Sequence, residues 1–246
     1  MIDVTFDFTT DTPGFWDGFW ERKNGLGASA VDPDNASPTL QRYHQFLWSK
    51  TLPNGEVMDL HLGTGSNYLW WKDFRFASDS IIVSFRYEKY RFMMDQVKEV
   101  VRDFRTYFED YLRKSYTIGG SIIFPKHQNS INQQRGTNIY IADRWDLTLE
   151  CIRRFYLEEN SPLNDVLLKD KEFFDLFGNF KGYVDYFLLQ DSVTKDYSRV
   201  KLWCGNADFI EDGLPKTVQE YFGFIENELE FIEKRNRRIK AYCDSL

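Results

Sequence analysis

A chain of 246 residues can bury a core of normal density, and we expect one domain over 1–246, with a strand-rich part (1–125) and a helix-rich part (140–246). The net charge of -7 argues against broad, nonspecific nucleic-acid binding, because such binding needs a basic surface to release phosphate counterions. No run approaches the roughly 18 apolar residues of a membrane span, and the first residues lack the pattern of a signal peptide.

The cysteines are odd in number, lie far apart and form no C-x-x-C pair; they are Cys151, Cys204 and Cys243. This usage is typical of a reducing compartment and predicts no structural zinc site. We therefore expect a cytoplasmic protein without a metal. The aromatic content of 17% is high, and it predicts an aromatic-rich core or binding face.

The first predicted elements are a strand and two helices. Apolar and polar residues alternate over residues 3–8, which predicts a half-buried strand. Aromatic residues at near-helical spacing over 15–20 predict a short amphipathic turn, with core packing favoured over a ligand-stacking surface. Ser37-Pro38 has the sequence of an N-cap followed by proline at the first helical position, and this helix should stop before the turn at 53–55.

A hairpin and a long helix are predicted next. Residues 68–76 and 81–86 have strand character and flank a polar stretch at 77–80, which predicts a hairpin. Apolar residues three or four apart over 90–116 predict the longest helix, which should cover the sheet and end at Gly119-Gly120.

The second half has mainly helical periodicity, with a short strand at 198–203 and helices at 163–177, 180–189 and 217–242. The basic end of the last helix, 234–240, complements the helix dipole, and a solvated terminus is favoured over a phosphate-binding patch. This order predicts an α+β fold. A small antiparallel or mixed sheet from the N-terminal half would be packed by the long helix over about 90–116, with a mainly helical C-terminal half.

Amides, charges of both signs and buried apolar side chains coincide most densely over 121–156. A polar loop there precedes a predicted helix for which Asp143 is a candidate N-cap. Glu150 reaches Arg153 and Arg154 at helical spacings of three and four residues. A charge ladder on a solvated helix surface is the favoured interpretation of this pattern.

The same stretch is our candidate ligand site. Guanidinium groups that can grip a phosphate or carboxylate come from Arg135, Arg144 and Arg153. Candidates for acid–base chemistry are His127, Asp146 and Glu150, although a lone histidine is more often structural. Gly136 would let the backbone approach a ligand closely, and the amide of Asn138 would contact polar ligand edges. No residue set predicts a metal or a particular cofactor.

A set of short segments is distinctive as a combination: 47–55, 78–80, 119–125, Ile131-Asn132, Arg135-Gly136, 141–156, 161–163 and 182–191. Together these segments resemble the signature of a family of uncharacterised bacterial proteins. The similarity covers nearly the whole chain, so it implies one family-wide architecture. The family has no activity from which a catalytic residue could be transferred.

Three functions follow from these observations. The favoured one is a pocket for an anionic small molecule or nucleotide, with hydrolysis as a candidate reaction; whether the chain is an enzyme is left open. The alternative is a non-catalytic protein–protein interaction or regulatory module with an exposed aromatic surface at 15–20 or 70–76. Nucleic-acid binding through 234–240 together with Arg153 and Arg154 is the least favoured.

Overall fold

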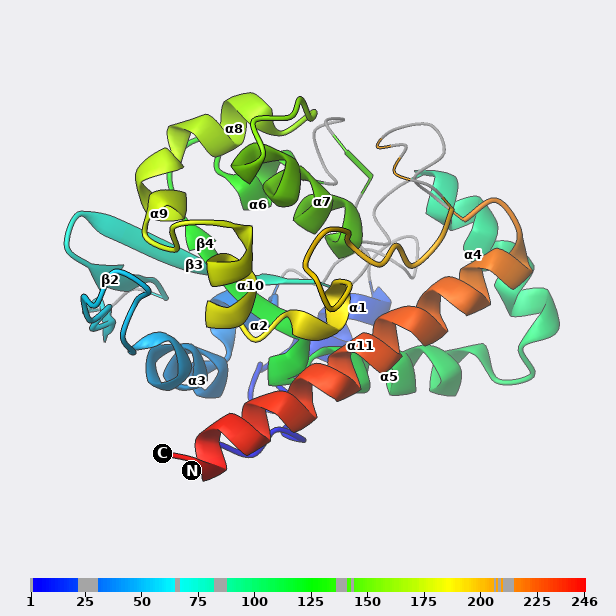
Figure 1. Ribbon diagram of the computed structural model, residues 1–246. Helices are drawn as coiled ribbons and strands as arrows, with labels where there is room; N and C mark the ends of the chain where they lie inside the picture. Colours follow the sequence, from blue (N-terminus) through cyan, green and yellow to red (C-terminus); the bar gives the residue numbers. More distant parts are fainter. Residues whose placement is uncertain are drawn as a thin grey trace.

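The computed structural model describes residues 2–21, 31–64, 67–81, 88–135, 141–142, 144–205, 207, 209 and 215–246. The elements in the first half are α1 (Phe15–Glu21), α2 (Pro33–Ala36), α3 (Pro38–Trp48), β1 (His61–Leu62), β2 (Leu69–Trp71), β3 (Phe74–Ser80), α4 (Glu88–Val100), α5 (Phe104–Ser115), the 3-10 helix η1 (Ile118–Gly120) and β4 (Ser121–Pro125). Those in the second half are α6 (Ile131–Gln134), α7 (Trp145–Tyr156), α8 (Asn164–Lys169), α9 (Lys171–Asp175), α10 (Phe180–Tyr186), the 3-10 helix η2 (Gln190–Ser192) and α11 (Val218–Asp244). The arrangement confirms the predicted α+β fold (Figure 1).

The strands form an antiparallel sheet in the order β1-β2-β3-β4. A tight turn joins β2 to β3, and Lys72 in this turn has a positive φ of 51°. β3 pairs with β4 from Phe76 opposite Pro125 to Ser80 opposite Ser121. Every residue of β4 is buried although it is an edge strand, so packed elements rather than solvent cover its open edge.

One face of the sheet is covered by α6 and α7, which lie above the strands in Figure 1. Phe124 of β4 pairs with Ala77 of β3, and residues that pair across two antiparallel strands share a face. Asp79, two residues after Ala77, therefore lies on the same face as Phe124. Phe124 packs against Trp145 of α7, with ring centroids 6.1 Å apart. Asp79 forms an ion pair with Arg135, which directly follows α6.

The opposite face is covered by α2, α3 and α9. Phe76 of β3 packs against Phe173 of α9, with ring centroids 5.6 Å apart. Ser78 is hydrogen-bonded to His44 of α3. The N-terminal end of α3 is set by the predicted cap, because the Ser37 hydroxyl accepts from the Leu40 N–H at 3.1 Å and Pro38 occupies the first helical position.

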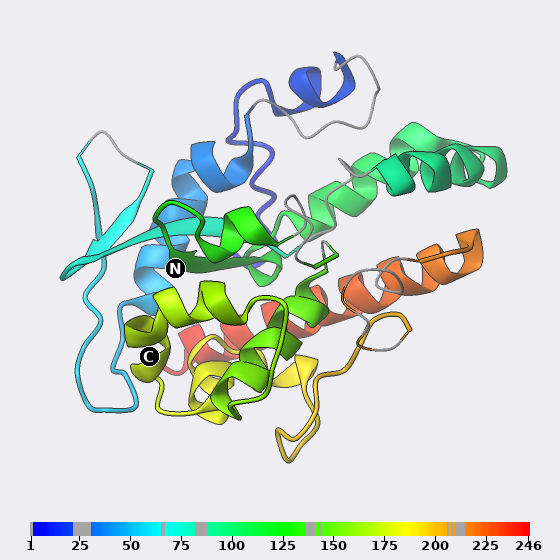
Figure 2. The same cartoon turned by 90° about the horizontal axis from the view of Figure 1, so that it is seen from above.

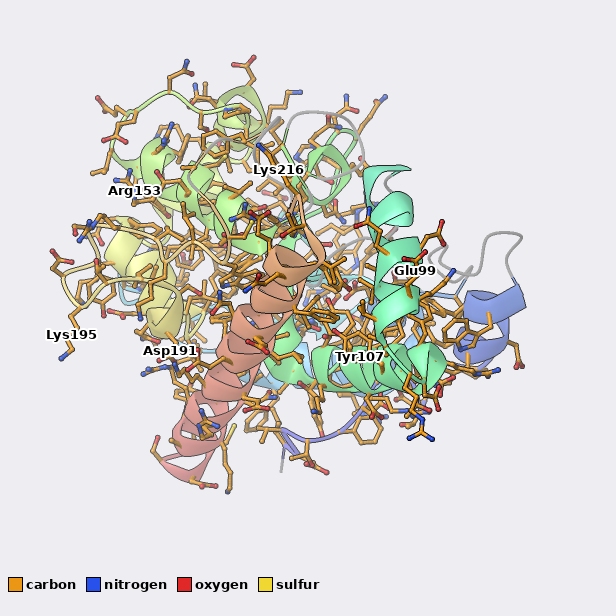
Figure 3. All side chains as sticks on the ribbon, turned by 90° about the vertical axis from the view of Figure 1, so that its right-hand side faces the viewer. Glu99, Tyr107, Arg153, Asp191, Lys195 and Lys216 are labelled. Atoms are coloured by element: carbon orange, nitrogen blue, oxygen red, sulfur yellow. The ribbon has the colours of Figure 1, made fainter. Side chains whose placement is uncertain are left out.

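Helix α11 is 27 residues long and crosses the molecule. Its first half lies beside α4 and α5, on the side away from β2 (Figures 1 and 2). Tyr107 of α5 points toward α11 and packs on Phe222, with ring centroids 5.9 Å apart (Figure 3). At the other end, the last turns bring Tyr242 close to the residues that follow α3.

The strand predicted over 3–8 is wrong, because this segment forms turns. Oδ1 of Asp3 accepts from the N–H and hydroxyl of Thr5 at 2.9 and 2.7 Å, and Oδ1 of Asp7 bonds Thr9 in the same way. Such Asx turns offer the backbone an alternative to a strand ladder. The strand predicted over 198–203 is also wrong; only an isolated bridge, between Val193 and Val200, is formed there.

Two predicted boundaries also differ from the structure. The helix predicted over 90–116 is divided into α4 and α5, because Asp103 begins a new helix by accepting from the Thr106 N–H at 3.1 Å. The stretch 77–80 is part of β3 rather than a hairpin turn, and the turn lies at Lys72 instead. Residues 82–86, predicted as the second strand of that hairpin, lie outside the described residues.

Buried apolar side chains from both halves of the chain belong to one core cluster. The aromatic side chains at 15–20 and 70–76 are either buried or half-buried, and an aromatic surface for a protein partner at these positions stays a prediction. Among the helices of the described ranges, none has the length and apolar character that a membrane crossing requires.

Candidate functional site

Arg144 and Asp146 form a buried ion pair at the start of α7. The guanidinium donates from Nε to Oδ1 of Asp146 at 3.0 Å and from Nη2 to Oδ2, which also accepts from the Trp203 N–H at 2.8 Å. Neither side chain is more than 1% exposed. Because α7 begins at Trp145, Arg144 occupies the N-cap position that was predicted for Asp143, which lies outside the described residues.

Arg135 is directed toward the sheet. Its Nη1 donates to Oδ2 of Asp79 at 2.9 Å and to the Ser80 carbonyl at 3.0 Å, and its Nε donates to Oγ1 of Thr148 at 3.1 Å. Arg135 and Arg144 therefore pair with different carboxylates on different elements. Their predicted neighbours Gly136 and Asn138 lie outside the described residues, so a shared anion site around them stays a prediction.

Glu150 holds the remaining charges of α7 together. It accepts two hydrogen bonds from Arg153, at 2.8 and 2.9 Å, and one from Arg154 at 2.9 Å. Burial acts to raise the pKa of Glu150, but these bonds outweigh it and the pKa is lowered. The spacing of the predicted charge ladder is confirmed, but its solvated character is not, because Glu150 is buried and Arg153, at the edge of the molecule in Figure 3, is half-buried. The two arginines keep Glu150 ionised at neutral pH.

His127 lies in the loop after β4, with both ring nitrogens hydrogen-bonded. Nε2 contacts Oδ1 of Asp170 at 2.9 Å, and Nδ1 donates to the Gln128 carbonyl at 2.8 Å. Burial raises the pKa of Asp170, and the neighbouring His127 opposes this shift. Proton transfer by His127 to a ligand stays a prediction, and it would require one of these two bonds to open.

The basic end of α11 is balanced by acidic partners. Lys234, Arg237 and Lys240 each pair with a carboxylate four residues away on the same helix. Arg238 pairs with Asp191, which lies beside α11 in Figure 3. Arg235 is fully buried. These contacts leave little of the unpaired positive surface that phosphate binding requires.

A serine, a histidine and an aspartate form a buried chain behind β3. Nδ1 of His44 accepts from Nε1 of Trp48 at 3.0 Å, so its Nε2 carries the proton and donates to the Ser78 hydroxyl at 2.9 Å. Ser78 in turn donates to Oδ1 of Asp34 at 2.7 Å. This direction is the reverse of a catalytic Ser–His pair, in which histidine accepts the serine proton. The chain therefore joins α2 and α3 to the sheet and does not activate a nucleophile.

A cavity of about 1230 Å³ lies between the end of α3, the loop that follows it, α10 and the end of α11. The loop is fixed to α3 because the Leu60 N–H donates to Oγ of Ser49 and the Leu60 carbonyl accepts from Nε2 of Gln45, both at 3.0 Å. Within the loop, Gly55 has a φ of +86°, which the predicted turn at 53–55 requires. These bonds hold two sides of the cavity in a fixed relation.

Lys50 lines this cavity, and its ammonium is surrounded by aromatic rings. Nζ lies 4.6 Å from the ring centroids of both Tyr186 and Tyr242 and 5.1 Å from that of Trp48. It donates to the Tyr186 carbonyl at 2.6 Å. No carboxylate of the described residues lies within ion-pair distance of it. Burial, together with the nearby Arg235, lowers the pKa of Lys50 to about 8.

Arg235 is a second cation without an acidic partner in the described part of the chain. Its Nη1 donates to the carbonyls of Gly119 and Ser121 at 3.0 and 2.8 Å, and its Nη2 donates to that of Phe187 at 3.1 Å. Burial lowers its pKa to about 9. Carbonyl oxygens supply partial negative charge only, so Arg235, which does not line the cavity, still adds positive potential at Lys50.

Arg42 lies at the cavity wall together with Lys50. It projects from the same face of α3 as Gln45, Phe46 and Ser49, and its Nη2 donates to the hydroxyl of Thr39 at 2.9 Å. Within the described ranges it forms no ion pair with a carboxylate. Lys181 also lines the cavity, but it pairs with Asp185.

One protein-family model matches the chain over nearly its full length. The model of a family described as "Family of unknown function (DUF6994)" matches residues 2–239. The chain belongs to this family. The resemblance inferred from the sequence is thereby confirmed, and the description of DUF6994 states no activity. Neither the curated proteins nor the solved structures gave a match.

Two of the segments that resemble the DUF6994 signature, 47–55 and 182–191, meet at the cavity. They supply Lys50 from one side and Tyr186 from the other, although 136 residues separate these positions. Lys50 does not stand out in the sequence, because it is one lysine among many and the rings around it come from distant elements. The coincidence of two family segments was the only signal that could have pointed to it. Within the described residues, no group of three or more His, Cys, Asp or Glu side chains is placed to hold a metal.

Proposed function

We propose that this protein binds an anionic small molecule in the cavity at Lys50. The observation that carries the proposal is the ammonium of Lys50 at the cavity wall, which has no carboxylate partner among the described residues. A buried charge without a counterion is costly, and a bound anion would offset that cost. Arg42 supports the same ligand class, because it is a second cation of this cavity without an acidic partner.

The walls of the cavity favour a ligand that also has an apolar or planar body. Phe46, Leu52 and Phe177 contribute apolar surface, and Tyr186 and Tyr242 contribute aromatic faces. Ligand pockets typically combine such walls with a few polar anchors. At about 1230 Å³ the space is large enough for a nucleotide or a sugar phosphate.

Hydrolysis of the ligand would require a carboxylate that can exchange protons. Asp185 accepts from the Tyr197 hydroxyl at 2.7 Å, from Nε2 of Gln190 at 2.9 Å and from Lys181. Burial acts to raise its pKa, but these bonds outweigh it and the pKa is lowered. Asp185 is thus a weak base. We therefore propose ligand binding, and the turnover of each ligand that binds can be measured separately.

A thermal-shift screen tests the proposal. Nucleotides, sugar phosphates and dicarboxylates are added to the purified chain, because a ligand that binds only the folded state raises its melting temperature. We expect at least one anionic class to stabilise the wild type and to lose affinity about tenfold or more in Lys50→Met, a loss of about 1.4 kcal/mol.

The matched control is Lys195→Met. Lys195 is exposed, extends from the surface (Figure 3) and is not one of the residues that line the cavity. It removes the same charge without touching the cavity, so hits should bind it as they bind the wild type. Equal loss of affinity in Lys50→Met and Lys195→Met would reduce the effect to net charge and contradict the proposal.

A further inference from the structure

Building on the proposed anion site, we infer that the ligand also carries an aldehyde or ketone group and that Lys50 captures it as a reversible imine. Four features point to this. Lys50 lies at the wall of a cavity, aromatic rings surround its ammonium, the cation Arg235 is nearby, and Lys50 forms no ion pair in the described part of the chain. Carbonyl-binding lysines are typically activated in this way, by desolvation or by a neighbouring positive charge.

The local charges make the neutral amine of Lys50 accessible near physiological pH. Lys50 is half-buried, its Nζ is partly shielded from water by Trp48, Tyr186 and Tyr242, and the buried guanidinium of Arg235 repels its proton. With a pKa of about 8, roughly a quarter of Lys50 is neutral at pH 7.5, against roughly 0.1% of an exposed lysine. Only the neutral amine has the lone pair that attacks a carbonyl carbon.

The aromatic rings around Lys50 would also stabilise the protonated imine that forms. They hold the ammonium of Lys50 through cation–π contacts at 4.6 to 5.1 Å. A protonated imine is a cation as well, so the same rings would stabilise it. The Tyr186 carbonyl, 2.6 Å from Nζ, is placed to accept the N–H of that iminium group.

The reaction balances without an oxidant or reductant. The lone pair of Nζ forms a C–N bond to the carbonyl carbon as the C–O π bond breaks, and one proton passes from the nitrogen to the oxygen to give a neutral carbinolamine. The hydroxyl then takes a second proton from solvent, the C–O bond breaks and water leaves, and the nitrogen keeps its remaining proton as the iminium. Arg42, on the same cavity wall, would bind the anionic group of the ligand while this bond forms.

Reductive trapping tests the inference. The full chain is incubated with pyridoxal 5′-phosphate, which combines an aldehyde with a phosphate, then reduced with borohydride and mapped by peptide mass spectrometry. We expect Lys50 to be labelled roughly tenfold faster or more than the exposed Lys195. The rate at Lys50 should level off above about pH 8, whereas the rate at an exposed lysine keeps rising toward its ordinary pKa of about 10.4.

Pyridoxine 5′-phosphate separates this inference from the proposed function, because it keeps the ring and the phosphate but has no carbonyl. Stabilisation by both compounds, lost in Lys50→Met, together with labelling at Lys50 supports both ideas. If the compounds stabilise the wild type but Lys50 is labelled no faster than Lys195, the imine is refuted and the anion site stands. If neither compound acts through Lys50 and no label accumulates there, both are refuted.

Two further variants separate imine formation at Lys50 from the effect of its charge, and phosphate binding at Arg42 from carbonyl binding. Lys50→Arg keeps the positive charge but cannot form an imine, so it should retain pyridoxine 5′-phosphate binding within about threefold and lose labelling at position 50. Arg42→Met should slow labelling by pyridoxal 5′-phosphate about fivefold or more and leave labelling by unphosphorylated pyridoxal unchanged. Equal slowing for both aldehydes would contradict the role of Arg42 in holding the phosphate.

Discussion

The start of α7 and the cavity at Lys50 both contain charged side chains, but the two regions differ in whether the cations form ion pairs within the chain. In α7 each guanidinium is paired with a carboxylate of the chain: Arg144 with Asp146, and Arg153 and Arg154 with Glu150. At the cavity, Lys50 has a backbone carbonyl and aromatic rings as neighbours and forms no ion pair with a carboxylate of the described residues. The density of charge therefore says little about where a ligand binds, whereas a desolvated charge without a counterion points to one.

The largest expected effect concerns the paired region. Arg144→Met leaves the buried Asp146 without its ionic partner, which is expected to lower the free energy of unfolding by about 3–5 kcal/mol. Urea denaturation of the purified variant measures this change. A loss below about 1 kcal/mol would show that the pair is dispensable for the fold and would reopen Arg144 as a ligand-binding group.

The next prediction is a pH effect at the cavity. Lys50 binds its proton less tightly in the folded chain than in the unfolded chain, because its pKa falls from 10.5 to about 8. The penalty is present below about pH 8 and is relieved as the pH rises to 10.5. The stability of the wild type relative to Lys50→Met should thus rise by up to about 3 kcal/mol across this window. Urea melts at both ends of the window, made in parallel on both proteins, measure the difference; a flat difference would mean that Lys50 is solvated like a surface lysine.

A smaller effect is expected behind β3. Ser78→Ala removes the hydroxyl between His44 and Asp34 and leaves both without that partner inside the protein, which should lower stability by about 1–3 kcal/mol. Binding of anions at the cavity should be unchanged, as measured by thermal shift. If Ser78→Ala abolished a turnover activity while its stability stayed at the wild-type value, the serine would be a nucleophile after all.

The smallest effect is expected at the rim of α7. Arg153→Met breaks an ion pair with Glu150 that Arg154 also contacts, so Glu150 keeps one cation. Because Arg154 still neutralises Glu150, no uncompensated charge is left behind, and we expect a loss of about 0–1 kcal/mol by urea denaturation. A loss well above it would show that the charge ladder is as essential to the fold as the buried Arg144–Asp146 pair.

The parts of the fold that were predictable depend on local signals. Ser37-Pro38 caps α3 through its own sequence, and α11 follows from apolar periodicity. The β3 stretch was misassigned because Ser78 and Ser80 have turn-like side chains. In the structure they are held in the strand by Asp34, which accepts from the Ser78 hydroxyl and the Ser80 N–H at 2.7 and 2.8 Å. Such a partner, more than 40 residues away, is invisible to any local pattern.

The candidate site shows the same limit more strongly. Amide and charge density selected 121–156, and local spacing correctly predicted the bonds from Glu150 to Arg153 and Arg154. Nothing local marks Lys50, whose environment is built by Tyr186 and Tyr242 from α10 and α11 and by the buried Arg235. Its lowered pKa is a property of tertiary packing, so it could be read only from the assembled structure.

The most direct test compares the two regions by ligand affinity. The dissociation constant of pyridoxine 5′-phosphate is measured by calorimetry for the wild type, Lys50→Met and Arg153→Met under the same salt conditions. We predict that Lys50→Met weakens binding about tenfold or more, while Arg153→Met changes it less than about twofold. Weakened binding in Arg153→Met with wild-type affinity in Lys50→Met would place the anion site at α7 and contradict the assignment to the cavity.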